Sequence, residues 1–163
     1  MNFSHLKNNK EIQMVDISNK KTTSREARAV AIIKFSSKTF KKIILDDSPK
    51  GSIFNTAVIA GTLAAKKTHE LIPLCHNINL SSINIDFKII KKNSSVEVNS
   101  IVKSSYKTGV EMEALTACSI ACLTIYDMCK SFDKEIIINK IRLKYKSGGK
   151  SGEYKNDKIY KST

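Results

Sequence analysis

Residues 82–104 read SINIDFKIIKKNSSVEVNSIVKS, and the predicted sheet is built from this segment. Apolar and polar side chains alternate with period two on both sides of KKNS (91–94), which predicts two antiparallel strands joined by a turn. The segment GVEMEALTACSIACLTIYDMCK (109–130) follows, and it is long enough for a helix of about six turns. Thr108 and Glu111 stand at capping-box spacing, which predicts where that helix begins.

The segments on either side of this β-β-α unit complete the order of elements. REARAVAIIKF (25–35) predicts a strand, with a helix as the rival interpretation, and TFKKIILDD (39–47) predicts a short helix. A second helix is expected over 52–71 with Ser52 as N-cap, and KEIIINKIRLKYK (134–146) predicts the last strand. This order predicts an α+β, ferredoxin-like antiparallel sheet with helices packed on one face and an extra helix in the first crossover.

Length and composition indicate a soluble protein with one domain. The chain has 163 residues, of which 41% are hydrophobic and 26% charged. We expect a polar N-terminal tail over 1–13, a single domain over 14–150 and a polar C-terminal tail over 151–163. The N-terminus lacks the apolar segment of a signal peptide, and the apolar run near 110–129 contains three acidic residues. We therefore expect a cytoplasmic protein that makes no contact with a membrane.

The charge is strongly positive, with 28 Lys and Arg against 15 Asp and Glu and a formal net charge of +13. Such a field attracts polyanions, although a drift in residue usage toward exposed lysines accounts for the surplus equally well. An RNA-binding module, the runner-up interpretation, needs aromatic residues interleaved with basic ones on a central strand. SVEVNSIVKS (95–104) and IIINKIRLK (136–144) contain none. We therefore do not expect a nucleic-acid partner.

Three of the four cysteines, Cys118, Cys122 and Cys129, lie on one stripe of the long helix. Their intervals match none of the usual zinc spacings. Free cysteine packs as a small apolar side chain, so we interpret these residues as part of the core and expect no metal site.

Two loop segments contain residue types that suit catalysis or anion binding. LIPLCHN (71–77) places His76, a candidate proton shuttle, at a junction between helix and strand, although a lone histidine is more often structural. KSGGKSG (146–152) lacks the first glycine of a P-loop. Its glycine amides beside Lys146 and Lys150 suit either an anion-binding nest or a flexible basic tail.

The end of the long helix carries a carboxylate with no structural explanation. Asp127 and Lys130 are three residues apart and can form an ion pair. The lysine is favourable at a helix C-terminus, whereas the aspartate is not. Glu113 lies fourteen positions earlier, close to four turns, so we expect it on the same face as Asp127.

These segments together resemble the cyclic pyranopterin monophosphate synthase family, the MoaC-type enzymes of molybdenum-cofactor biosynthesis. The resemblance runs from MVDIS (14–18) and REARA (25–29) through ELIPLCH (70–76), KTGVEMEALTA (107–117) and LTIYDMCK (123–130) to KSGGKSG. It implies a lyase that converts (8S)-3′,8-cyclo-7,8-dihydroguanosine 5′-triphosphate into cyclic pyranopterin monophosphate with release of pyrophosphate. The substrate would come from a radical GTP cyclase, and no cofactor is expected. The resemblance also implies a homohexamer, a trimer of dimers, with active sites built across the dimer interface.

Carried over by motif, the resemblance implies three catalytic residues, Asp127, Lys50 and Lys130. The chemistry moves protons and neutralises negative charge, which suits lysines of lowered pKa as acids and bases and charged lysines as triphosphate ligands. The implied substrate-binding residues are Leu74, Cys75, His76, Met112, Glu113, Arg25, Lys66 and Lys146.

Three positions depart from the family pattern. Asn77 stands where Pro is common, Val58 where Arg is found, and Ser52 where Asp is found. Serine caps a helix about as well as aspartate, so we expect Ser52 to preserve the fold. The changes at Ser52 and Val58 motivate a further alternative, a catalytically weakened structural homologue.

Overall fold

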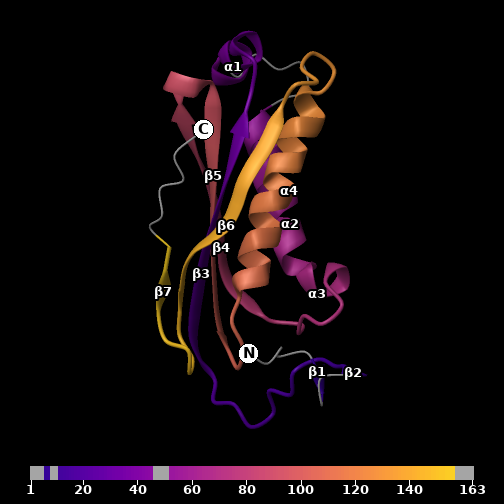
Figure 1. Cartoon of the computed structure of the whole chain (residues 1–163), viewed down its shortest axis with the longest axis vertical. Helices are drawn as coiled ribbons and strands as arrows, with labels where there is room; N and C mark the ends of the chain where they lie inside the picture. The colour runs from indigo at the N-terminus through magenta and orange to yellow at the C-terminus, as the bar shows by residue number, and fades with distance from the viewer. Residues whose placement is uncertain (1–5, 8–10, 46–51, 157–163) are drawn as a thin grey trace.

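A five-stranded antiparallel sheet in the order β4-β5-β3-β6-β7 forms the framework of the computed structural model (Figure 1). The structure describes residues 6–7, 11–45 and 52–156, so Lys50 lies outside the described residues. The strands of this sheet are β3 Thr23–Lys34, β4 Leu80–Ile90, β5 Ser95–Tyr106, β6 Ile137–Ser147 and β7 Tyr154–Lys155. The predicted α+β class with an antiparallel sheet is confirmed, and the strand order is consistent with a ferredoxin-like fold.

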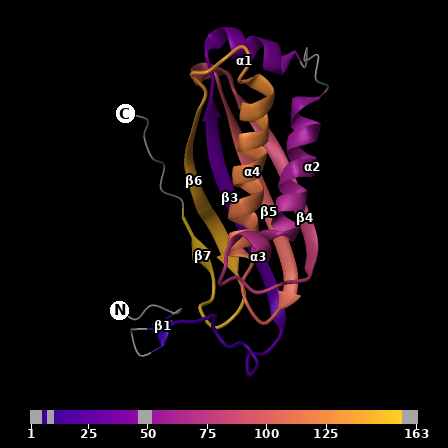
Figure 2. The ribbon, with the colours of Figure 1, turned by 90° about the vertical axis from the view of Figure 1, so that its right-hand side faces the viewer.

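The helices lie on one face of the sheet, as the sequence predicts. They are α1 Ser37–Ile44, α2 Ile53–Lys66, α3 Thr68–Leu71 and α4 Glu111–Cys129, with a 3-10 turn at Lys91–Asn93. Helices α2 and α4 lie side by side and run in opposite directions (Figure 2). Helix α4 packs on β3, β5 and β6, while α2 packs on β4. The other face of the sheet carries no described helix.

The core lies between the sheet and these two helices. On β3 the alternate residues Ala27, Ala29 and Ala31 are buried, and their small side chains let α4 approach the sheet closely. The stripe of Cys118, Cys122 and Cys129 on α4 is fully buried, so the core interpretation of these cysteines is confirmed. Val58 on α2 is half-buried and packs against the same core.

Helix α4 is the one described helix whose length and apolar composition would suffice to cross a membrane. Half of its apolar segment is buried, and it packs between the sheet and α2. Core helices of globular proteins share this composition. The helix is therefore explained by its place in the core.

The start of α4 corrects the predicted capping box. The N-cap is Val110, and no side-chain hydrogen bond caps the helix. Thr108 precedes this N-cap by two residues and therefore cannot occupy its place. Glu111 is the first helical residue, and its carboxylate pairs with Lys146 on β6 at 3.0 Å. The charge of Glu111 also lies at the helix end where the dipole favours an anion.

The helix predicted over 52–71 divides into α2 and α3. Ser52 is the N-cap as predicted, because its hydroxyl oxygen accepts a hydrogen bond from the Asn55 amide at 3.4 Å. The break falls at Lys67. The buried Thr68 hydroxyl donates to the carbonyls of Ala64 and Ala65, satisfying two acceptors at the end of α2.

Short strands lie in both segments that the sequence predicts to be polar tails. Strand β2 Glu11–Ile12 pairs with β1 Leu6–Lys7. Strand β7 pairs with β6, with Tyr154 opposite Lys146 and Lys155 opposite Tyr145. The interpretation of KSGGKSG as a flexible tail is therefore wrong, since its glycines form the turn that returns the chain to the sheet.

Candidate active site

A pocket of about 530 Å³ opens at the end of the sheet where α4 begins. Four segments and β3 form its walls: residues 15–20, the 74–78 loop after α3, the 107–113 start of α4, and the 146–151 turn after β6. Seven of the eight predicted substrate-binding residues line it; only Lys66 does not. The seven are Arg25, Leu74, Cys75, His76, Met112, Glu113 and Lys146.

Basic side chains converge on this pocket from several segments. The sequence motifs identify Arg25 and Lys146, and the anion-nest interpretation adds Lys150. Lys20 and Lys107 also line the pocket, and sequence reasoning missed both. Lys107 begins the KTGVEMEALTA motif, a signal that could have identified it, whereas nothing local marks Lys20. The convergence of these cations suits a polyanionic ligand.

The turn after β6 forms the wall beside Lys146. Gly148 and Gly149 both have positive φ, at 94° and 75°, a conformation that glycine adopts without steric cost. The ammonium group of Lys146 lies 3.2 Å from the Ser151 hydroxyl oxygen as well as 3.0 Å from the Glu111 carboxylate. The turn therefore brings backbone, a hydroxyl and two lysines to one side of the pocket, as an anion-binding nest requires.

The N-terminal strap, defined here as residues 15–20, lines the pocket with Val15 and Lys20 and is held by two pocket side chains. His76 Nε2 lies 2.8 Å from the Val15 carbonyl oxygen, and the Lys107 ammonium donates to the Ser18 carbonyl at 2.7 Å. Because a carbonyl oxygen can only accept, His76 Nε2 carries the hydrogen in this contact. In the neutral ring Nδ1 is then the atom that can accept a proton.

Glu113 is the buried acid of the pocket, with only 4% of its surface exposed. Burial raises the pKa of the Glu113 carboxyl to about 7, and the nearby charge of Glu111 acts in the same direction. Burial also raises the pKa of the Cys75 thiol, to which the charge of Glu113 contributes. The Glu113 carboxyl can therefore hold or release a proton near neutral pH, whereas Cys75 stays a thiol there.

The predicted catalytic pair lies elsewhere in the chain. Asp127 and Lys130 form an ion pair at 2.6 Å, with more than half of each side chain exposed. Fourteen residues separate Asp127 from Glu113, about 21 Å along the helix, so the expected shared face does not bring them into one site. The hydrogen bond that Lys130 donates to Asp127 and the negative charge of Asp127 raise the pKa of Lys130, opposite to the lowered pKa expected of a lysine that exchanges protons at neutral pH.

The remaining predicted residues divide between the two ends of the molecule. Lys66 is exposed at the last residue of α2 and does not line the pocket. Ser52 is the N-cap of α2, and this helix begins at the end of the molecule where α4 finishes (Figure 2). The side chain of Asn77 is exposed in the loop that also supplies Leu74, Cys75 and His76 to the pocket.

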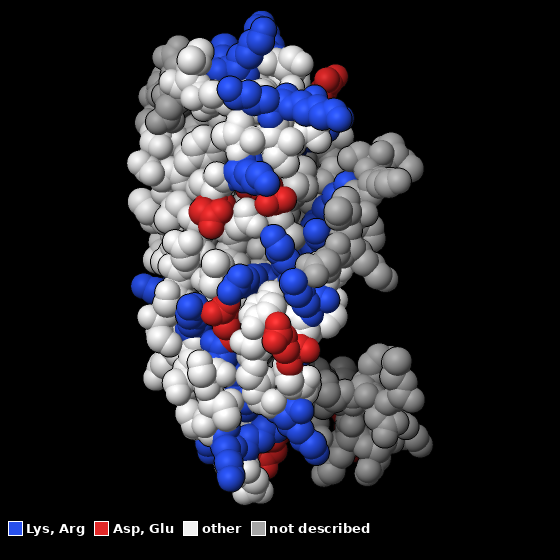
Figure 3. Space-filling view, turned by 90° about the vertical axis from the view of Figure 1, so that its left-hand side faces the viewer, with Lys and Arg blue, Asp and Glu red and all other residues white. Residues whose placement is uncertain are grey.

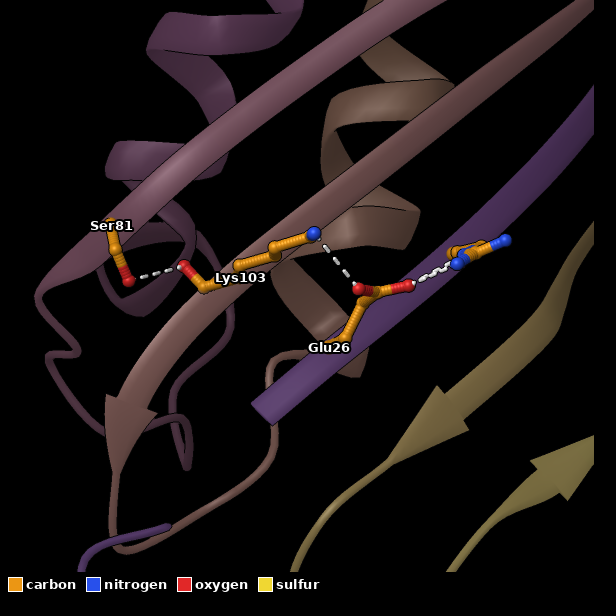
Figure 4. Close-up of polar contacts among 4 residues, drawn as sticks. Glu26, Ser81 and Lys103 are labelled. Atoms are coloured by element: carbon orange, nitrogen blue, oxygen red, sulfur yellow. Dashed lines mark hydrogen bonds and ion pairs between the residues drawn. The ribbon is translucent and has the colours of Figure 1, made fainter. Parts of the chain in front are cut away.

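The face of the sheet that carries no described helix, called the open face here, differs from the pocket in its distribution of charge. Lys and Arg side chains spread over it with Asp and Glu among them (Figure 3). Glu26 pairs with Arg28 and with Lys103, the latter at 3.2 Å (Figure 4). Although burial opposes ionisation, these two partners lower the pKa of Glu26. Arg28 and Lys103 on this face are thus paired locally, an arrangement that does not favour the RNA-binding interpretation.

Comparison with known proteins agrees with the motifs. Residues 14–149 match the model of the MoaC family. The chain is 48% identical over 155 residues to proteins named cyclic pyranopterin monophosphate synthase from Bordetella avium, Bordetella pertussis and Bordetella bronchiseptica. Each alignment covers 95% of this chain and 96% of the relative.

Proposed function

The chain belongs to the MoaC family, and we propose that it is a cyclic pyranopterin monophosphate synthase, a lyase of molybdenum-cofactor biosynthesis. Its substrate would be (8S)-3′,8-cyclo-7,8-dihydroguanosine 5′-triphosphate, supplied by a radical GTP cyclase, and pyrophosphate would leave. The observation that supports this most directly is the pocket, where cations from four segments surround a buried carboxyl. Such a site suits a triphosphate whose organic part exchanges protons.

The lysines of the pocket would hold the triphosphate. Lys107, Lys146 and Lys150 flank the connection to α4 and the glycine turn, and Lys20 approaches from the N-terminal strap. Each Lys ammonium presents three donors to phosphate oxygens, and the glycine turn adds backbone amides. Release of pyrophosphate leaves negative charge on the departing group, which these cations stabilise.

Glu113 and His76 would serve the organic part of the substrate. The pKa of Glu113, raised by burial to about 7, lets this carboxyl donate a proton or accept one at physiological pH. Nδ1 of His76 is free of the contact that Nε2 makes with Val15. Ring opening and ring closure both require such transfers. Leu74 and Met112 add an apolar surface to the pocket, against which a base can pack.

We propose that Asp127 and Lys130 act in the pocket of a neighbouring subunit. Their exposed ion pair contributes little to folding, because water screens it, so stability alone does not explain it. A distance of about 21 Å along α4 keeps the pair away from its own pocket. Lys50 would belong to the same group of catalytic residues. A homohexamer built as a trimer of dimers, with active sites at the dimer interface, would bring both groups together.

Entry of Asp127 into a second subunit's site would also change the surroundings of Lys130. In the single chain, Asp127 raises the pKa of Lys130. Cations from the partner pocket would lower the pKa of this ammonium again and permit acid-base catalysis. We place this assembly in the cytoplasm, as a biosynthetic enzyme.

The direct test incubates the purified full-length protein with the cyclic triphosphate and measures both pyrophosphate and cyclic pyranopterin monophosphate. We expect turnover by the wild type and a loss of at least about tenfold in kcat/KM for Lys146→Met. The matched control is Lys88→Met, an exposed lysine on β4, which should keep wild-type kinetics.

Absence of both products with the wild type would contradict the proposed enzymatic activity. Binding of the triphosphate without turnover would instead favour the weakened structural homologue that Ser52 and Val58 suggest. Wild-type kinetics for Lys146→Met would contradict the assignment of the pocket.

A further inference from the structure

Arg25 is the one basic side chain among the described residues that is buried, with 9% of its surface exposed. It lies near the start of β3, on the row that faces the helices and continues with Ala27. Its Nε donates to the Tyr106 carbonyl at 3.3 Å, and its Nη2 donates to the Lys107 carbonyl at 3.3 Å. Two donors of the guanidinium are therefore directed at consecutive carbonyls where β5 ends and the connection to α4 begins.

The glycine turn after β6 closes over the other side of the same guanidinium. A Cβ atom at Gly149 would lie 1.7 Å from Arg25 Nη1, and one at Gly148 would lie 2.1 Å from the Ser24 carbonyl oxygen. Neither position has room for a side chain, and both have positive φ. The backbone of this turn thus packs directly against Arg25. One buried side chain contacts two separate walls of the pocket.

These two walls carry the lysines of the anion site. Lys107 belongs to the first, and Lys146 and Lys150 flank the second. Because the guanidinium is planar and its donors are fixed in a fork, it sets both the distance and the angle between the backbones that it touches. An ammonium group supplies the same charge without that fork. Geometry and charge at position 25 can therefore be separated by mutation.

We propose that Arg25 is a positioning residue, which holds the Lys107 connection and the Gly148–Gly149 turn at the spacing at which their lysines together bind a triphosphate. This inference rests on the proposed function for the chemical class of the ligand. It assigns Arg25 a role through other residues, in place of the direct substrate contact that the family resemblance implies. The guanidinium acts on the substrate by way of the loops that it joins.

The test measures binding of inorganic tripolyphosphate to the full-length protein by calorimetry for Arg25→Lys, Gly149→Ala and the double variant. We expect each single change to weaken binding about tenfold, because either one breaks the contact between turn and guanidinium. Because the two substitutions remove the same interaction, their effects should not add. The double variant should therefore bind no more than about twofold more weakly than the single variant with the lower affinity. Arg28→Lys is the matched control, on the same strand but the opposite face, and should bind like the wild type.

Two further measurements separate positioning from a general loss of structure. Hydrogen exchange in unliganded Arg25→Lys should become faster at 107–109 and 148–151, with the exchange of β4 and α2 unchanged. In the enzyme assay KM for the cyclic triphosphate should rise about tenfold while kcat changes less than about threefold, because Arg25 orders binding groups and touches no reacting atom.

Several outcomes would overturn the proposal. Wild-type affinity for tripolyphosphate in Arg25→Lys would show that charge alone suffices at this position. Additive losses in the double variant, or unchanged hydrogen exchange in both walls, would show that Arg25 and the turn act independently. If the wild type releases no pyrophosphate while Arg25→Lys and Gly149→Ala still weaken tripolyphosphate binding without additivity, the proposed enzyme would be contradicted and the positioning role supported.

Discussion

The carboxyl of Glu113 shows how one residue sets the pH response of the site. The pKa of this group is about 7 in the folded protein against an ordinary value of 4.5. Between these values the folded state binds more protons than the unfolded state, so the free energy of unfolding falls as pH rises through this window. The difference between the two pKa values lowers the free energy of unfolding by about 3 kcal/mol at pH 8. The enzyme therefore retains this acid at a cost in stability.

We predict that Glu113→Gln unfolds at a higher denaturant concentration than the wild type at pH 8 and at a similar one at pH 4.5. Glutamine cannot ionise, so the variant avoids the burial of a charge, and its advantage should grow from pH 5 to pH 8. Urea unfolding at a series of pH values measures this. Glu70→Gln, an exposed partner of Lys67, is the control. Parallel pH profiles for wild type and Glu113→Gln would refute the burial argument.

Glu111 competes with an anionic ligand for Lys146. Its carboxylate holds the ammonium at 3.0 Å, and about a quarter of each side chain is exposed. We predict that Glu111→Gln binds tripolyphosphate about fivefold more tightly, because a negative charge leaves the pocket and Lys146 is released. Calorimetry at low and high salt measures the change, which should shrink as salt increases. Glu97→Gln on the open face is the control, and equal affinities would contradict the competition.

At this scale the motifs located much of the pocket. LIPLCHN and KTGVEMEALTA supplied Cys75, His76 and Glu113 because each motif stays together in the fold. Lys20 could not be found in this way. It lies on the N-terminal strap, which His76 and Lys107 hold at the pocket, and those contacts join residues far apart in the sequence.

At the scale of elements, the contact between α2 and α4 depends on one glycine. A Cβ at Gly61 would lie 2.6 Å from Ile85 Cδ1 and 2.7 Å from the Ala117 carbonyl oxygen. The first of these atoms ends a flexible side chain, but the second belongs to the backbone of α4. The helices therefore lie too close together for any side chain at position 61.

We predict that Gly61→Ala lowers the free energy of unfolding by about 1–3 kcal/mol. In an exposed helix the same substitution would stabilise by about 1 kcal/mol through helix propensity, so the sign of the effect reports the packing. Chemical denaturation measures it, with Asn55→Ala on the exposed face of α2 as control. Stabilisation by Gly61→Ala would show that α4 shifts to admit the methyl group.

Local patterns predicted most elements and failed where distant contacts decide. The hairpin over 82–104 and the long helix follow from periodicity, and both are present as β4, β5 and α4. The capping box failed because α4 begins at Glu111 with Val110 as N-cap, and the Glu111 carboxylate pairs with Lys146 on β6. Strand β7 was missed because two residues, Tyr154 and Lys155, carry no pattern of their own and form a strand only against β6.

At the scale of the whole molecule, the two ends of α4 separate the proposed binding groups from the proposed catalytic pair. If neighbouring subunits share each site, a variant lacking Asp127 and a variant lacking Lys146 can complement one another. A mixed dimer would contain one doubly altered site and one intact site. The separation of the two groups along α4 therefore predicts complementation between subunits, which no local sequence pattern indicates.

We predict that Asp127→Asn and Lys146→Met, each inactive alone, recover about 25% of wild-type turnover when unfolded together at equal amounts and refolded. Random pairing makes half of the dimers mixed, and half of the sites in those dimers are intact. Mixing Asp127→Asn with Lys130→Met is the control and should stay inactive, because both changes fall in one group. Equal recovery in both mixtures, or in neither, would contradict a shared site.

The pairing of β3 with β6 has a consequence for how the protein reaches its active form. Glu26 lies opposite Ser147, so β3, the first strand of the five-stranded sheet, can complete its pairing only after β6 has been synthesised. Folds dominated by such distant pairs form slowly, because much chain entropy is lost before the pairs are made. During synthesis the pocket cannot exist until the glycine turn has left the ribosome. A polyphosphate that binds there then stabilises only the completed fold, so ligand supply would raise the surviving fraction of newly made chains.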